Sequence, residues 1–99
     1  MTDISDAVTA LPDKTLLLLD DDAPLRNRLG RALEQRGFDV ELAESVAEAH
    51  RLLRARPPAY AVCDMRLGDG AGLEVVEAIR NVRPDSRIIM LTGYGNIAT

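Results

Sequence analysis

Four oxygen-bearing side chains in this sequence follow short apolar runs, in positions where they could take part in chemistry. Carboxylates that lie close together repel one another, so a cluster of them favours a bound cation. Ligands that are all oxygens suit Mg²⁺, which binds one or two carboxylates together with phosphate. An aspartate beside such a cation can attack a phosphoryl group, and a nearby hydroxyl can hydrogen-bond the phosphoryl oxygen. The side chains are Asp20 and Asp21 after residues 15–19, Asp64 after 59–63, and Thr92 after 87–91.

Three apolar runs, and one segment at 38–42 that alternates apolar and acidic residues as an edge strand does, are separated by three helical patterns. This alternation would bring the side chains together. It predicts an α/β fold, a doubly wound parallel sheet with helices on both faces and right-handed crossovers. The carboxyl ends of such strands share one edge of the sheet, where ligands bind. We therefore expect the acids and Thr92 to meet in one crevice. The strands are predicted at 15–19, 38–42, 59–63 and 87–91, and the helices between 22 and 37, between 45 and 57, and at about 73–82.

The helix ends are marked by capping residues. Asp22 can cap the first predicted helix, Pro24 is tolerated in its first turn, and Gly37 supplies its stop. Ser45 and Glu48 form a capping-box pattern for the second. The apolar positions expected to face the sheet are Leu25, Leu29, Ala32 and Leu33 on the first helix and Leu73, Val76 and Ile79 or their neighbours on the third.

Composition limits the class of protein. A chain of 99 residues with 46% hydrophobic and 28% charged residues is one ordinary globular domain, and its net charge of -4 gives no footprint for nucleic acid. The single cysteine fits a reducing compartment, and no apolar run reaches the roughly 20 residues that span a bilayer. We expect a cytoplasmic protein with no membrane segment, in which residues 1–13 are a flexible leader with little structure.

Three segments, in order and at these spacings, carry a family resemblance. The chain resembles the receiver (CheY-like) domain of bacterial two-component response regulators, with a flavodoxin-like fold. Within that family it is most similar to the redox-responsive global regulators of the photosynthesis-control type, whose receiver loop reads much like residues 66–70. The segments are 16–22 (LLLLDDD), 64–73 (DMRLGDGAGL) and 88–93 (IIMLTG).

The resemblance implies a role for each site residue. Asp64 would be phosphorylated by a sensor histidine kinase, with Asp20 and Asp21 as the acidic pair that holds Mg²⁺. The main-chain carbonyl of Arg66 would be a further Mg²⁺ ligand. The Thr92 hydroxyl would contact the phosphoryl group and act as a switch. The output of the longer protein would bind DNA through a domain absent from residues 14–99, which are the part that resembles a receiver.

Two departures from the family pattern stand out. Gly68 occupies a position where the family normally has proline, and we expect this to soften the loop without blocking the chemistry. Receivers also continue through a further helix, strand and helix that carry a lysine for the phosphate, whereas this sequence ends at Thr99. We therefore expect the sheet order 2-1-3-4, about two-thirds of a receiver, with residues 87–91 as an exposed edge that invites self-association.

Other interpretations of the same residues remain open. The acids after residue 19 could only cap a helix, and Asp64 could be an acid in a turn. Residues 68–72 could be a dinucleotide loop, but glycines that permit a positive φ in a tight turn are the stronger interpretation. Cys63 is expected to be a buried apolar residue and His50 to lie on the surface. Thr92 could be a plain strand-end hydroxyl, and the arginines of the first helix could be a solvated face or a kinase-docking face.

Three functions are consistent with the sequence. The first is a phosphoacceptor that takes part in its own phosphorylation but is not a turnover enzyme. The second is an interaction or dimerisation module that cannot be phosphorylated. The third is a small phosphohydrolase, which needs a second acid where this chain has Arg66.

Overall fold

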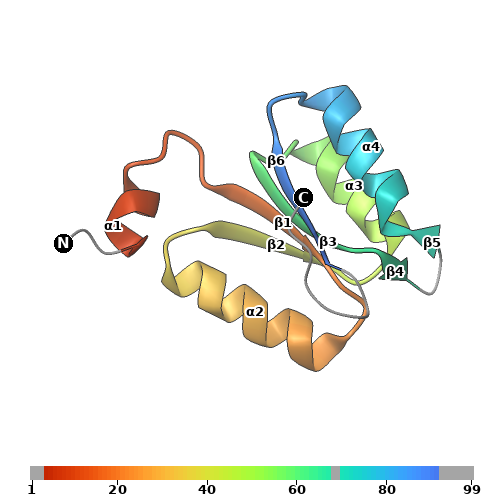
Figure 1. The fold of residues 1–99 in the computed structure, drawn as a ribbon, viewed down its shortest axis with the longest axis horizontal. Helices are drawn as coiled ribbons and strands as arrows, with labels where there is room; N and C mark the ends of the chain where they lie inside the picture. The colour runs from red at the N-terminus through yellow and green to blue at the C-terminus, as the bar shows by residue number, and fades with distance from the viewer. Residues whose placement is uncertain (1–3, 68–69, 92–99) are drawn as a thin grey trace.

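The computed structural model describes residues 4–67 and 70–91, which are built around a four-stranded parallel sheet in the order β2-β1-β3-β6. Helix α2 covers one face of the sheet, and α3 and α4 lie side by side over the other (Figure 1). The predicted α/β class, the helices on both faces and the strand order 2-1-3-4 are confirmed. The sheet strands are β1 (Thr15–Leu19), β2 (Asp39–Ala43), β3 (Tyr60–Asp64) and β6 (Arg87–Leu91), and the helices that cover it are α2 (Ala23–Gln35), α3 (Val46–Ala55) and α4 (Gly72–Val82).

Strand β1 is the centre of the fold because its leucines supply both hydrophobic layers. Leu16 and Leu18 pack into the cluster beneath α2, whereas Leu17 and Leu19 pack into the larger cluster beneath α3 and α4. All four are at most 4% exposed. A strand buried on both faces is continuously apolar rather than alternating, which is why the run of leucines predicted this strand.

The predicted helix ends are confirmed. The Asp22 carboxylate accepts the Leu25 N–H at 3.1 Å, and Gly37 follows α2 with φ of +105°. The Ser45 hydroxyl accepts the Glu48 N–H at 3.1 Å. The Glu48 carboxylate reaches back to the N–H of Glu44 at 3.2 Å, one residue before the cap.

Three apolar positions were wrongly predicted to face the sheet, and Ala32 is one of them, since it is exposed on α2. Leu25 is 41% exposed and Leu73 is 45% exposed, whereas Val75 is fully buried beside Val76. In the described part of the chain α2 lies alone on its face of the sheet, where Leu29 and Leu33 pack against the core and the other predicted positions do not. Leu73 follows directly after Gly72, where α4 begins, and the helix turns this position away from the sheet.

Within residues 4–13 the expectation of little structure is wrong, because Ile4–Thr9 form a short helix, α1. Val8 is only 5% exposed and lies against Gly37 at the end of α2. Asp13 accepts hydrogen bonds from the N–H and hydroxyl of Thr15 at 3.0 and 2.8 Å, and it pairs with Arg83 at 2.8 Å. We call Asp13, Thr15 and Arg83 the Asp13 clasp.

The loop after Asp64 contains a short antiparallel pair that periodicity did not reveal. Strand β4 (Arg66–Leu67) pairs with β5 (Gly70–Ala71), and β5 leads directly into α4. Among the described helices, none combines the length and the apolar character needed to cross a bilayer.

Candidate functional site

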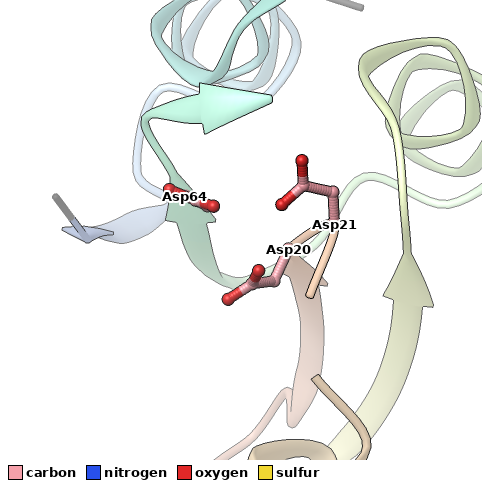
Figure 2. A group of neighbouring side chains, drawn as sticks. All are labelled: Asp20, Asp21 and Asp64. Atoms are coloured by element: carbon pink, nitrogen blue, oxygen red, sulfur yellow. The ribbon is translucent and has the colours of Figure 1, made fainter. Parts of the chain in front are cut away.

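Three carboxylates meet at the carboxyl end of the sheet. Asp20 and Asp21 follow β1 directly, and Asp64 is the last residue of the neighbouring strand β3. One oxygen from each of the three lies within 4.8 Å of the others. Figure 2 shows the side chains arranged around a common space, from two adjacent strands. The parallel pairing of β1 with β3 thus brings together acids that are more than 40 positions apart in the sequence.

Asp20 is the buried member of this group, with 3% of its surface exposed. Its Oδ1 accepts the N–H of Asp22 at 2.9 Å, and its own N–H donates to the carbonyl of Ala43 at 3.0 Å. Burial is the largest cause that raises the pKa of Asp20 above its usual value, and repulsion from Asp64 and Asp21 acts in the same direction. The hydrogen bond from Asp22 opposes the rise without cancelling it.

Asp64 is held by the loop that follows it. Its Oδ1 accepts the N–H of Arg66 at 3.0 Å, which orients the carboxylate. The next residue, Met65, donates its N–H to the carbonyl of Leu91 at 2.9 Å and ties the loop to β6. Leu91 is also the register partner of Asp64, so the end of β6 lies beside the acid. The predicted phosphoryl contact, Thr92, is the next residue along the chain but lies outside the described residues.

Gly72 contacts the site, but its predicted role, a positive φ in a tight turn, is wrong. A Cβ on Gly72 would lie 1.9 Å from the carbonyl oxygen of Asp64 and 3.2 Å from Cα of Met65. The start of α4 therefore rests directly on the backbone of Asp64. Among the described glycines only Gly37 has a positive φ, so close backbone approach, not turn conformation, requires glycine at 72. A glycine at the first position of a helix, where it is a poor helix former, was the available signal.

The three carboxylates fit a hard divalent cation. The cluster offers only oxygens, and it places a buried carboxylate beside two others whose charges oppose its ionisation. A cation with oxygen ligands relieves that repulsion. Arg66 lies on the loop beside Asp64, but its carbonyl as a cation ligand remains a prediction, as do the ligand roles of the acids.

The other singled-out residues are not part of the acidic cluster. Cys63 is fully buried, and burial raises the pKa of its thiol to about 12, which confirms it as a core residue. His50 is half-buried rather than on the surface, because its Nε2 lies 3.4 Å from Oε1 of Glu74 on the neighbouring helix α4. Arg28 and Arg31 are exposed on α2.

Comparison with known proteins identifies clear relatives. A family model for the response regulator receiver domain matches residues 16–99. The chain is 59% identical over 99 residues to the acid tolerance regulatory protein ActR of Sinorhizobium medicae, which is 100% of this chain and 51% of ActR. It is 61% identical over 87 residues to the photosynthetic apparatus regulatory protein RegA of Cereibacter sphaeroides, covering 88% of this chain and 47% of RegA. The chain thus spans about half the length of the curated relatives it matches, and the likeness to RegA confirms the resemblance to photosynthesis-control regulators.

Solved structures agree with this. A response regulator from Burkholderia pseudomallei, solved with a phosphorylated aspartic acid, a calcium ion and citrate, has a TM-score of 0.78 and 36% identity. The alignment covers 86% of this chain and 50% of that protein. The response regulator TrrA of Thermotoga maritima, solved in complex with Mg²⁺-BeF, has a TM-score of 0.74 and 31% identity, covering 82% of this chain and 70% of TrrA.

Proposed function

The chain belongs to the response regulator receiver domain family, and from this premise we propose that it accepts a phosphoryl group on Asp64 from a sensor histidine kinase. The single observation that carries the proposal is the meeting of Asp20, Asp21 and Asp64 within 4.8 Å at the carboxyl end of the sheet. The aspartyl phosphate and calcium ion in the similar Burkholderia protein, and the Mg²⁺-BeF in TrrA, support the same chemistry here.

In this mechanism Asp64 is the nucleophile. Its Oδ1 is engaged by the N–H of Arg66, which leaves the second oxygen to attack phosphorus as the bond from phosphorus to the donor nitrogen breaks. The electron pair of that bond leaves with the donor. Asp20, Asp21, Asp64 and the Arg66 carbonyl would hold Mg²⁺, which supplies positive charge to offset that of the transferring phosphoryl group. The Thr92 hydroxyl would donate a hydrogen bond to a phosphoryl oxygen.

The proposal also covers what the chain does with the phosphoryl group. Because Arg66 stands where a phosphohydrolase would need a second acid, the domain is a phosphoacceptor and not a turnover enzyme. It acts in the cytoplasm, and its conformational change controls a DNA-binding output carried by another part of the longer protein. The relatives ActR and RegA, which are regulatory proteins by name and about twice as long as this chain, support that assignment.

Intact-mass measurement after incubation with acetyl phosphate tests the function. We expect a single phosphoryl adduct with Mg²⁺, no adduct when Mg²⁺ is chelated, and none in the Asp64→Asn variant. An adduct that persists in this variant would show that another residue is the acceptor. If no adduct forms although Mg²⁺ binds, the chain is an interaction module that cannot be phosphorylated.

We also propose that β6 mediates self-association of this chain. In the sheet that the structure describes, β6 is an edge strand, and its Ile89 is 48% exposed. An edge strand presents unpaired backbone groups that a second copy can pair with. Sedimentation velocity over a range of protein concentrations should show a dimer that the Ile89→Lys variant weakens. A monomer at the highest concentration would disprove this part of the proposal.

A further inference from the structure

Arg26 lies near the start of α2, and its guanidinium turns back onto the end of β1. Its Nη1 donates to the carbonyl oxygen of Asp20 at 2.9 Å, and the bond is partly shielded from solvent. Asp20 is only 3% exposed, so water cannot readily replace this donor. A hydrogen bond from a charged donor is among the stronger kinds, and it becomes stronger when shielded.

This contact acts on the backbone that carries two of the three acids. The other bonds that hold the turn from Asp20 to Asp22 come from main-chain donors. The N–H of Asp20 donates to Ala43 and the N–H of Asp22 to the Asp20 carboxylate, while the N–H groups of Leu25 and Arg26 donate to Asp22. Arg26 adds a side-chain clamp from the helix to the carbonyl between the two consecutive acids. Among the described residues, its guanidinium forms no ion pair with a carboxylate of the cluster, so it acts through the main chain.

We propose that Arg26 is a positioning residue that raises the affinity of the acidic site for a divalent cation. By fixing the Asp20 carbonyl it sets the direction in which the side chains of Asp20 and Asp21 leave the backbone. Ligands of a metal site must be held within about half an ångström of their working positions by such supporting bonds. The inference rests on the cation site of the proposed function.

The charge of Arg26 works against this effect, and the opposition makes the proposal testable. A guanidinium near the cluster repels an incoming cation, so removing its charge alone would strengthen binding. Loss of the backbone clamp would weaken binding. The sign of the change in affinity therefore separates a positioning role from a simple electrostatic one.

The experiment measures Mg²⁺ binding by isothermal titration calorimetry on the wild type, Arg26→Ala, Arg26→Lys and Arg28→Ala. We expect the Kd of Arg26→Ala to rise about tenfold, the lower end of what loss of a supporting hydrogen bond costs at metal sites. Arg28 is exposed on the same helix and carries the same charge, so Arg28→Ala should change Kd less than about twofold. Arg26→Lys, which keeps the charge and can keep one donor, should fall between the wild type and Arg26→Ala.

Other outcomes of the calorimetry would count against the inference, each for a different reason. An unchanged or lower Kd in Arg26→Ala means that the clamp does not position the acids. Equal changes in the Arg26→Ala and Arg28→Ala variants mean that charge alone acts. A lower urea midpoint in chelator with an unchanged Kd means that Arg26 serves only stability.

If Arg26→Ala does not fold, a wild-type Kd in Arg26→Lys counts against the proposal and a raised one supports it. If the wild type itself binds no Mg²⁺, the cation site of the proposed function fails, and this inference fails with it.

Discussion

An aspartate lies near each end of strand β1, and the pKa values of the two carboxyl groups are shifted in opposite directions. Asp13, just before the strand, is surrounded by donors, and hydrogen bonds from Thr15 followed by the contact with Arg83 lower its pKa to about 2. Asp20, just after the strand, is buried beside other acids, and its pKa is raised. The carboxylate is therefore the favoured form at one end and the disfavoured form at the other.

The opposite pKa shifts mean that the Asp13 carboxylate stabilises the fold, whereas the Asp20 carboxylate does not. Because the folded pKa of Asp13 is lowered, its contribution is present above pH 3.8 and is lost as the pH falls through about 2. The pKa of Asp20 is raised, so its contribution to the free energy of unfolding has the opposite sign. Its ionisation destabilises the fold at neutral pH, and this effect is lost when acid protonates the carboxylate. At the acidic end the carboxylates repel one another, and a bound cation can relieve that repulsion. In the Asp13 clasp the carboxylate is already paired with Arg83.

The largest expected effect comes from breaking the acidic end at its backbone, with Gly72→Ala. The new Cβ would meet the Asp64 carbonyl oxygen at 1.9 Å, and backbone on both sides cannot yield as a side chain would. We expect a loss of about 3 kcal/mol or more in the free energy of unfolding, measured by urea titration, together with loss of the acetyl phosphate adduct.

Gly30→Ala is the matched control. Its Cβ would approach Cδ2 of Leu42 at 2.8 Å, but Leu42 is 36% exposed and its side chain can rotate away. The higher helix propensity of alanine offsets the displacement, so stability should stay within about 1 kcal/mol of the wild type. Equal losses in both variants would show that the contact between Gly72 and Asp64 is not special.

Asp20→Asn tests the repulsion at the acidic end. Without Mg²⁺ we expect the variant to be more stable by about 1 kcal/mol, because a neutral amide removes buried charge and still can accept the N–H of Asp22. The same variant should bind Mg²⁺ more weakly by calorimetry. Asp21→Asn is the exposed control and should stabilise less. A destabilised Asp20→Asn would contradict the view that ionised Asp20 is disfavoured.

Asp13→Asn tests the other end of β1 and should destabilise the protein, whereas Asp20→Asn should stabilise it. We expect Asp13→Asn to lower the free energy of unfolding at pH 7, because the clasp loses its ion pair with Arg83. The loss should be only about 1 kcal/mol, because solvent partly screens that ion pair. The affinity for Mg²⁺ should not change. The gap between variant and wild type, followed by urea unfolding, should close as the pH falls from about 4 towards 2. A gap that is constant with pH would exclude ionised Asp13 as its source.

The acidic end could be predicted from the sequence, and the other end could not. Parallel topology alone places the residues after β1 and β3 side by side, so Asp20, Asp21 and Asp64 follow from the order of the elements. The caps at Asp22 and Ser45 were equally local signals. Sequence patterns suffice for these features because each cap lies next to its own helix, and each acid lies at the end of a strand whose place in the sheet follows from the strand–helix–strand order.

The remaining features depend on contacts that no local pattern encodes. The Asp13 clasp joins residues 70 positions apart through Arg83, whose position in the turn before β6 gives no hint of its partner. Helix α1 is too short to show a periodicity, and it is held by the packing of Val8 on Gly37. The need for glycine at position 72 arises where α4 meets Asp64, which only the assembled fold defines.

The smallest expected effect is on the labelling rate of Cys63 by a thiol reagent. This rate tests whether the stability changes at the two ends of β1 alter the opening of the core. Cys63 lies in β3 beside Asp64, it is fully buried, and its thiol pKa is raised to about 12. A thiolate is the reactive species, so a thiol reagent should label the folded protein only when the whole chain unfolds. The labelling rates of Asp13→Asn and Asp20→Asn should then follow their unfolding equilibria, faster in the first and slower in the second. Rapid labelling of the stable wild type, with no dependence on urea, would mean that β3 opens locally and that the acidic end is not supported by a rigid core.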